Sequence, residues 1–249
     1  VHTIYSGKDY SKINHSFLQK RISGGILVGN EKDSGAIKKI TDMGYPIAVV
    51  DYDPKEIERH TMKDSNLIVV NSMDFEGTVQ ALNYIIGLGH NDIGIITGRN
   101  ETYSGKQRFE AYKHVMEQCG YEIRQEFILE GGFLKKKTYN EVEKLIKSKK
   151  LPTALFACND DMALAAMEVF EREGIKVPED ISIIGFDDIP VASQMKPALT
   201  TVRVPVDDMV TKATDLLIAS IENEDRSFRC EIFSTEFISR DTCMKIDKQ

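Results

Sequence analysis

Short apolar runs alternate with amphipathic segments along nearly the whole chain. The runs are almost continuously apolar and rich in Val and Ile, as strands buried on both faces of a parallel sheet are. In the first half they lie at residues 2–5, 24–28, 46–50, 66–70 and 92–97, and in the second half at residues 154–158, 181–186 and 231–238. We therefore predict a strand at each of these places.

The segments between these runs have the period of an amphipathic helix. The clearest are Phe75–Leu88, Asp160–Glu173 and Val206–Ile221, each with its apolar residues on one face. Glycines that follow helical runs, where a left-handed helix cap is expected, are Gly44, Gly89, Gly120 and Gly174. This alternation predicts an α/β fold with parallel sheets covered by helices on both faces. Because the pattern recurs in the two halves, we expect two similar lobes.

Composition narrows the class of protein. The chain has 249 residues, of which 41% are hydrophobic and 29% charged, as in a globular protein with one large domain or two lobes. A net charge of −7 argues against a surface devoted to nucleic acid. The sequence contains no apolar run of membrane-spanning length, and its start lacks the apolar core of a signal peptide.

Four cysteines are spread widely along the chain: Cys119, Cys158, Cys230 and Cys243. They form no CxxC pair, which favours reduced thiols in a cytosolic protein over a zinc site or a disulfide framework. We expect neither a metal nor a cofactor.

Polar side chains, mostly carboxylates and amides, follow four of the predicted strands. They are Asp51-Tyr52-Asp53, Gly98-Arg99-Asn100, Asn159-Asp160-Asp161 and Asp187-Asp188. In open α/β sheets, ligands bind beyond the carboxyl ends of the strands. Arg108 lies early in a helix near the same edge, and Phe133 offers an aromatic face. Because carboxylates accept and Arg and Asn donate hydrogen bonds, these groups predict a site for a polyhydroxylated ligand such as a sugar.

Each of these residues also has a purely structural interpretation. Asn159 or Asp160 is well placed to cap the helix that follows it. Asp188, and Asp53 before Pro54, suit the first position of a turn. Arg108 can lie on a helix surface, and Phe133 can pack within its loop. The sequence alone leaves both interpretations open.

Three segments resemble one known family, the lactose/galactose-repressor family of bacterial transcription regulators. The longest, PTALFACNDDMALAAMEVFEREGIKVPEDISIIGFDDIPVASQMKPALTTVRVP, is similar to the family's core signature. GLGHNDIGIITG resembles its LGH-strand motif, and RFEAY its Arg-x-x-Gly-aromatic motif, with Ala111 where Gly is usual. The resemblance runs from about Gly24 to Cys243.

The resemblance implies two Rossmann-like lobes joined by three crossovers, with an effector bound between them. We expect an N-terminal lobe of residues 1–97 plus 203–229 and a C-terminal lobe of residues 98–202 plus 230–243. It further implies a cytoplasmic homodimer that pairs through its N-terminal lobe, is not associated with a membrane, and acts allosterically without catalysis. Operator DNA would be bound by a helix-turn-helix that precedes this chain. The family's first strand and first helix are also expected before VHTIYS, which would be the second strand.

Position by position, the resemblance implies that six residues bind the effector. They are Asp51, Asp74, Arg108, Phe133, Asn159 and Asp187, of which Asp74 is the weakest match because its segment reads MDFEG instead of Asp-Asn-x-x-Gly. Val204 stands where the family usually has Gln, which removes one polar contact to a ligand.

Two other classes of protein remain open. In the first, a magnesium-dependent phosphohydrolase, Asp51 is the nucleophile, Asp53 the acid/base, and Asp187 and Asp188 are metal ligands. Pro54 stands where that motif requires Gly, which counts against it. In the second, a periplasmic sugar-binding protein, the fold is the same, and only residues can decide between the classes.

Overall fold

The structure is a computed structural model that describes residues 22–28, 34–59, 66–223 and 227–246. The chain forms two compact units. Among the described residues, the first unit contains those within 1–72, 101–103 and 205–233, and the second contains those within 73–100, 104–204 and 234–249. Apart from the short excursion at residues 101–103, the chain crosses between the units after Ser72, after Val204 and after Phe233.

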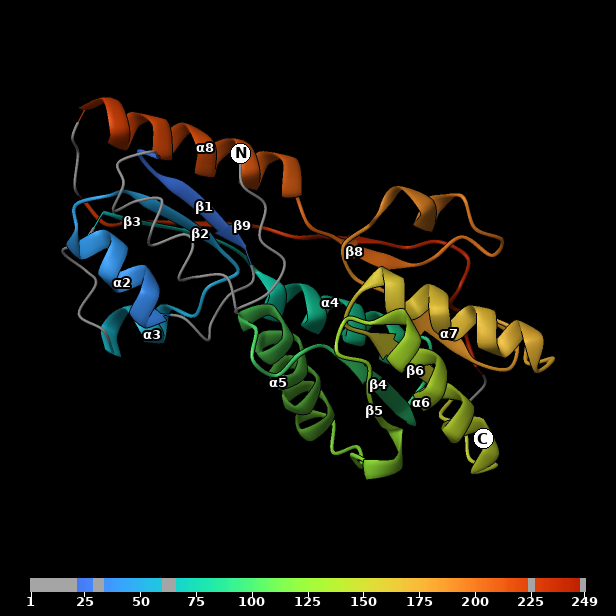
Figure 1. The fold of residues 1–249 in the computed structure, drawn as a ribbon. Coiled ribbons are helices and arrows are strands. Elements are labelled where there is room, and N and C mark those ends of the chain that lie inside the picture. Colours follow the sequence, from blue (N-terminus) through green and yellow to red (C-terminus); the bar gives the residue numbers. More distant parts are fainter. Residues whose placement is uncertain (1–21, 29–33, 60–65, 224–226, 247–249) are drawn as a thin grey trace. The chain divides into compact units, whose positions relative to one another are not determined.

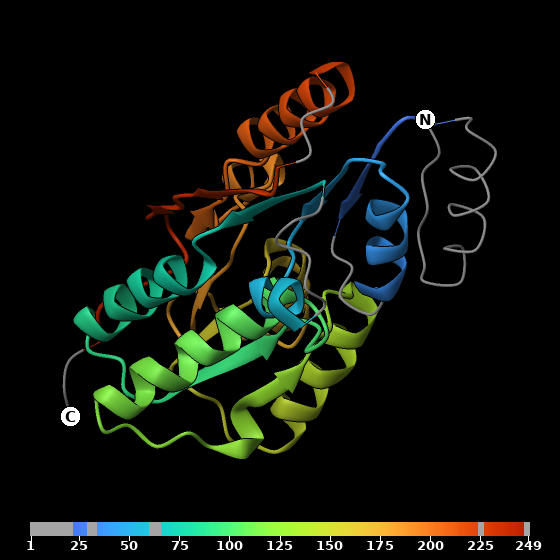
Figure 2. The same cartoon turned by 90° about the vertical axis from the view of Figure 1, so that its left-hand side faces the viewer.

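A four-stranded parallel sheet is the centre of the first unit. Its strands, in the order β1-β2-β3-β9, are β1 (Gly25–Val28), β2 (Ile47–Val50), β3 (Leu67–Ser72) and β9 (Arg229–Phe233). Helix α8 (Val206–Asn223) covers one face, and α2 (Ser34–Asp42) and the short α3 (Pro54–Arg59) lie on the other (Figures 1 and 2). The central strands β2 and β3 are apolar because both faces are covered, as the fully buried Ile47, Leu67 and Val69 show.

The second unit has its own four-stranded parallel sheet, in the order β5-β4-β6-β7. The strands are β4 (Ile93–Thr97), β5 (Ile128–Glu130), β6 (Ala154–Ala157) and β7 (Ser182–Ile184). Helices α4 (Asp74–Gly87) and α5 (Tyr103–Gln118) lie on one side, and α6 (Lys135–Lys147) and α7 (Asp160–Arg172) on the other (Figures 1 and 2). Two short 3-10 helices, η1 (Gln125–Phe127) and η2 (Pro190–Ser193), complete it.

A two-stranded antiparallel ribbon lies next to two of the crossings between the units. Strand β8 (Thr201–Arg203) precedes the crossing after Val204, and β10 (Glu236–Ile238) follows the crossing after Phe233. Arg203 and Glu236 are directly opposite each other in this ribbon.

The hydrophobic pattern predicted most of these elements correctly. The predicted strands from residue 24 onward are confirmed, except that residues 231–238 form two strands, β9 and β10, in different sheets. The pattern missed β5 and β8, each three residues long. The strand predicted at residues 2–5 lies outside the described residues. All four cap glycines are confirmed, with φ between 67° at Gly120 and 101° at Gly89.

The predicted lobe boundaries need correction, and at two places the correction moves strand residues to the other unit. Strand β4 pairs with β5 and β6, so residues 73–97 belong to the second unit and not to the first. Strand β9 pairs with β3, so residues 230–233 belong to the first unit and not to the second. Both errors arise because strand pairing between residues distant in sequence, which sets the boundary, leaves no local mark on the sequence.

The histidine of the LGH segment has a structural position. His90 is buried, with Nδ1 hydrogen-bonded to Thr153 Oγ1 at 3.0 Å and Nε2 to the Met244 carbonyl at 2.9 Å. Burial lowers the pKa of His90, so the neutral ring is favoured. His90 therefore ties the start of β4 to the loop before β6 and to the C-terminal residues.

Candidate functional site

A buried arginine is the centre of the candidate site, and the whole of it lies in the second unit. Arg108, in α5, is 6% exposed. Its Nε donates to Asp74 Oδ2 at 3.2 Å, and Nη2 lies 3.2 Å from the same oxygen. Nη1 donates to Asp187 Oδ1 at 3.2 Å and also to the backbone carbonyl of Cys158. Carboxylates from α4 and from the segment after β7 thus hold one guanidinium between them.

Two aromatic rings lie near the guanidinium of Arg108. The Arg108 Cζ atom lies 3.7 Å from the centre of the Phe186 ring and 6.0 Å from the centre of the Phe133 ring. Phe133 has a left-handed backbone, with φ of 60°. Its ring lies so close to Gly98 that a Cβ there would be 2.2 Å from it. Glycine at position 98 is therefore what lets Phe133 lie over the end of β4, within range of Arg108.

Asp187 and Asp188 form a turn of unusual backbone geometry. Their φ angles are 110° and 55°, a region that non-glycine residues seldom adopt. Strand β8 fixes the turn, because Asp187 N donates to the Val202 carbonyl at 2.7 Å. Strained backbone of this kind is concentrated at binding and catalytic sites. The turn directs the Asp187 carboxylate, whose side chain is 32% exposed, to Arg108.

The buried carboxylate of Asp160 holds this turn through two hydrogen bonds. Its side chain is fully buried, with Oδ2 accepting from Ile189 N at 2.9 Å and Oδ1 from Thr201 Oγ1 at 2.6 Å. A Cβ at Gly185 would lie 2.2 Å from Asp160 Oδ1, so the carboxylate occupies space that only glycine leaves open. Asp160 thereby joins the start of α7, the turn and β8.

Asp188 does not point to the same partners as Asp187. Its Oδ2 accepts from Arg203 Nε at 2.8 Å and its Oδ1 from Arg240 Nη2 at 2.6 Å. The Asp188 side chain is 7% exposed. The turn expected at this residue is present, but the carboxylate also forms a double ion pair that sequence reasoning missed.

Burial raises the pKa of two carboxyl groups in this region. It raises the pKa of Asp160 to about 7, although the hydrogen bonds from Thr201 and Ile189 oppose the shift. It raises the pKa of Asp187 to about 6, although the Arg108 guanidinium opposes it. Groups with raised pKa values in a polar cluster are typical of functional sites, and structural ion pairs also produce them.

The other predicted residues have separate positions. Asn159 caps α7, because its Oδ1 accepts from Met162 N at 2.9 Å. Asp51 lies in the first unit, directly after β2, with a left-handed φ of 61°. Of the six predicted residues, the structure brings Asp74, Arg108 and Asp187 into direct contact, with Phe133 beside them.

The geometry does not fit the alternative class, a magnesium-dependent phosphohydrolase. Asp53 accepts from Lys55 N at 2.9 Å at the start of α3, and this is the role of a turn residue. Asp188 is committed to two arginines. Among the described residues, no group of three or more His, Cys, Asp or Glu side chains is arranged to hold a metal ion.

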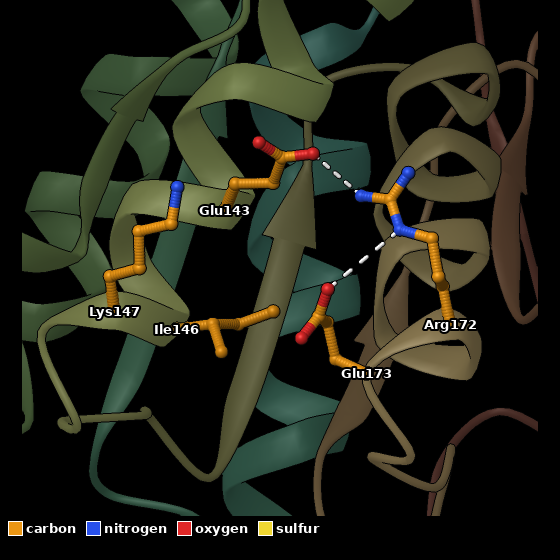
Figure 3. Close-up of a pocket in the computed structure, with 5 residues that line it drawn as sticks. All are labelled: Glu143, Ile146, Lys147, Arg172 and Glu173. Carbon is orange, nitrogen blue, oxygen red and sulfur yellow. Dashed lines mark hydrogen bonds and ion pairs between the residues drawn. The ribbon is translucent and has the colours of Figure 1, made fainter.

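A surface hollow in this unit lies between the ends of α6 and α7 (Figure 3). Arg172 donates to Glu143 at 2.6 Å and lies 3.8 Å from Glu173. Arg172 thus pairs on the surface with both glutamates that line the hollow, as the dashed lines in Figure 3 show. The residues that line the hollow are not part of the Arg108 cluster. Surface ion pairs of this kind contribute little to stability.

Comparison with known proteins identifies the family. Residues 82–243 match the family model of the periplasmic binding protein-like domain. The probable HTH-type transcriptional repressor ExuR of Bacillus subtilis is 32% identical over 96% of this chain and 70% of its own length. The HTH-type transcriptional repressor PurR of Haemophilus influenzae is 32% identical over 83% of this chain and 59% of its own length. The chain belongs to the LacI family of transcriptional regulators.

A solved structure supports the same conclusion for the fold. It is a LacI-family sugar-binding transcriptional regulator from Escherichia coli complexed with phosphate, 27% identical, with a TM-score of 0.80 over 97% of this chain and 84% of that chain. Membership of a LacI-type repressor family confirms the predicted fold class and the binding, non-catalytic class of function. No described helix of this LacI-family chain is long and apolar enough to cross a membrane.

Sequence reasoning missed several residues that shape the site. Phe186 stacks most closely on Arg108, and Arg203 and Arg240 fix the turn together with Asp160, a predicted strand-end residue whose bonds to the turn were not foreseen. Phe186 was visible only as an apolar residue of a predicted strand. Asp160 was visible as a helix cap, and nothing near Arg203 or Arg240 in sequence indicates that they meet Asp188.

Proposed function

We propose that this chain is the effector-binding domain of a LacI-family transcriptional repressor and that its effector is a neutral, polyhydroxylated molecule, most simply a sugar. Asp187 carries the proposal. Its backbone is strained and is fixed by β8. Its partly exposed carboxylate pairs with the buried Arg108. Such preorganisation has a cost in folding energy, which a binding role explains.

The charges of the cluster support a neutral ligand. Arg108 already donates Nε to Asp74, and Nη1 to Asp187 and to the Cys158 carbonyl. The cluster therefore contains two carboxylates and one guanidinium that is largely engaged by them. A phosphate or carboxylate ligand would face the charge of Asp187, whereas sugar hydroxyls would donate to it. The Phe133 ring at the edge of the cluster suits the C–H face of a sugar.

The remaining roles follow from the family. We propose that Asp51 and Asn159 also contact the effector, that the protein acts in the cytoplasm as a homodimer, and that operator DNA is bound through a helix-turn-helix of the whole protein. The chain spans about 59% of the PurR repressor and 70% of ExuR. The activity of the whole protein is therefore inferred from such relatives.

A ligand screen followed by calorimetry tests the proposal. We expect at least one neutral sugar from a panel of D-galactose, D-ribose and cellobiose to raise the melting temperature, because binding to the native state stabilises it. D-glucuronate, glucose 6-phosphate and hypoxanthine complete the panel. We expect Asp187→Asn to weaken the binding of the best sugar by about tenfold or more, since a ligand hydroxyl would lose a charged acceptor.

Asp161→Asn is the matched control. Asp161 follows Asp160 in α7 but is half-exposed and pairs with Lys135 on the surface, so its variant should bind the sugar like the wild type. Binding of only the phosphate or the purine, or equal affinity in the Asp187→Asn variant and the wild type, would overturn the assignment.

A further inference from the structure

Asp188 contacts both segments through which the chain leaves and re-enters the second unit. Arg203 is the last residue of β8, one residue before the crossing after Val204. Arg240 lies two residues beyond β10, the strand that follows the return at Ser234. Each arginine donates to a different oxygen of Asp188, at 2.8 Å and 2.6 Å. One carboxylate therefore links the two crossing segments to each other.

The same carboxylate is one residue away from the candidate site. Asp187 meets Arg108, while Asp188 meets the crossing segments. The backbone between them is held on β8, with Asp187 N bonded to the Val202 carbonyl at 2.7 Å and Val204 N to the Asp187 carbonyl at 3.5 Å. With both residues at positive φ, the turn has few alternative conformations into which a displacement of Asp187 can relax.

The bonds of Asp188 favour the transfer of its displacement to Arg203 and Arg240 over a local loss of these ion pairs. The Asp188 side chain is 7% exposed and that of Arg240 16%, and removing one partner from such a largely buried ion pair is strongly unfavourable. The arginines have further bonds within the same region, from Arg203 Nη1 to Glu236 Oε2 at 2.9 Å and from Arg240 Nη1 to the Leu199 carbonyl at 2.8 Å. A displaced Asp188 would thus move the arginines with it.

We propose that Asp188 is a positioning residue that couples the Arg108–Asp187 ion pair to the β8–β10 ribbon at the crossings. The coupling rests on the proposed function, because in the repressor it would be an effector competing for Asp187 that acts through this coupling. The alternative is that Asp188 only stabilises the ribbon, independently of what Asp187 contacts. The two differ in whether a change confined to Asp187 reaches the ribbon.

A mutant cycle read by hydrogen exchange separates them without any ligand. Exchange of the amides of residues 201–203 and 236–238 is measured in the wild type, in Asp187→Asn, in Arg240→Gln and in the double variant. Asp187→Asn keeps the shape of the side chain and weakens its pairing with Arg108. We expect it to speed exchange in the ribbon by about fivefold, as the loss of one net hydrogen bond does, and to have no such effect in the Arg240→Gln background.

Controls exclude a general loss of stability. Exchange in the buried strand β6 is used to normalise every variant, because global unfolding would speed both regions alike. Glu236→Gln removes the exposed partner of Arg203 and leaves both contacts of Asp188, so in that background the effect of Asp187→Asn should persist. If Arg240→Gln fails to fold, Asp188→Asn replaces it in the cycle.

The outcomes are decisive in both directions. A ribbon that does not respond to Asp187→Asn, or responds equally with and without Arg240, overturns the coupling. If the coupling is observed but no sugar of the panel binds, the assignment of the effector fails while the role of Asp188 stands.

Discussion

The ends of β2 and β7 carry the same sequence signal and are built differently. Each strand is apolar and is followed by an aspartate at positive φ, Asp51 directly after β2 in the first unit and Asp187 shortly after β7 in the second. After β2, the neutral side chain of Asn71 fixes the backbone, accepting from Tyr52 N at 3.0 Å and donating to the Tyr52 carbonyl at 2.9 Å. After β7, titratable and charged side chains fix it, with Asp160, Asp188 and Arg108 as the main ones.

The difference shows that a positive-φ aspartate after a strand does not define one kind of site. A buried amide satisfies a backbone N–H and a backbone C=O, and its contribution does not depend on pH. Buried ions satisfy the same needs at a larger cost in desolvation, and their contribution changes with pH and with the partner's charge. The second arrangement sets the Asp187 carboxylate against a buried arginine, so the predictions below compare the two ends.

The largest effect is expected from removal of the cation. Arg108→Met removes the guanidinium that pairs with both Asp187 and Asp74, the latter only 3% exposed. We expect the free energy of unfolding to fall by about 3–5 kcal/mol, the usual effect of breaking a buried ion pair. Denaturant titration measures it. Arg172→Met, which removes a surface arginine between Glu143 and Glu173, should cost about 1 kcal/mol or less, and an equal loss in the two variants would contradict the prediction.

The second effect is a pH dependence confined to the end of β7. Burial raises the pKa of Asp160 from 3.8 to about 7. Between these values the native state holds a proton that the unfolded state has lost, so stability is greatest at low pH and falls as pH rises from about 4 to about 7. We expect up to about 4 kcal/mol from this group, at about 1.4 kcal/mol per pH unit.

Asp160→Asn supplies the reference for that measurement. The amide does not titrate, so the wild type should lose stability relative to Asp160→Asn as pH rises from 4 to 7, with no further change above it. Denaturant titrations at each pH give the difference between the two proteins. A difference that is constant across this range would show that Asp160 is ionised in the native state throughout.

A third, smaller effect should appear at the end of β2. Asn71 is 3% exposed, and Asn71→Ala leaves the Tyr52 N–H and C=O without this partner. We expect a loss of about 1–3 kcal/mol, of equal size at pH 5 and pH 8 because the amide does not titrate. Asn140→Ala, at an exposed position of α6, is the control and should be near neutral. A loss at Asn71 that changes with pH would mean that a charged group shares this clamp.

Much of the fold was predictable because it depends on local pattern. Continuous apolar runs such as residues 92–97 and 154–158 have to be buried on both faces, and Gly89 and Gly174 mark the helix ends before the next strands. Three-residue strands such as β8 carry too few positions for a period to show. Lobe boundaries depend on which distant strands pair, and the sequence alone does not reveal that.

The candidate site was predictable in part for a related reason. Residues at strand ends converge on one edge of a sheet, so Arg108 and Asp187 were expected near each other, although 79 positions separate them. The partner of Asp188, 52 positions away at Arg240, follows from the path of the crossing segments and from no local signal. The ends of β2 and β7 likewise differ through residues that lie outside these two strands, namely Asn71 at the first end and the charged side chains at the second.

The smallest effect tests whether Asn159 contacts the ligand together with the charged residues after β7 or only caps helix α7. Asn159→Ala removes the bond to Met162 N and should lower the free energy of unfolding by about 1 kcal/mol. Asn159→Asp keeps an acceptor for that bond, so stability should be retained. Asn159→Asp also replaces the side-chain NH₂ donor with an acceptor, and we expect it to bind the best sugar of the panel about fivefold more weakly, as the loss of one hydrogen bond predicts. Calorimetry and thermal melts on the two variants separate the roles, since a residue that only caps α7 would leave the sugar affinity of Asn159→Asp at the wild-type value.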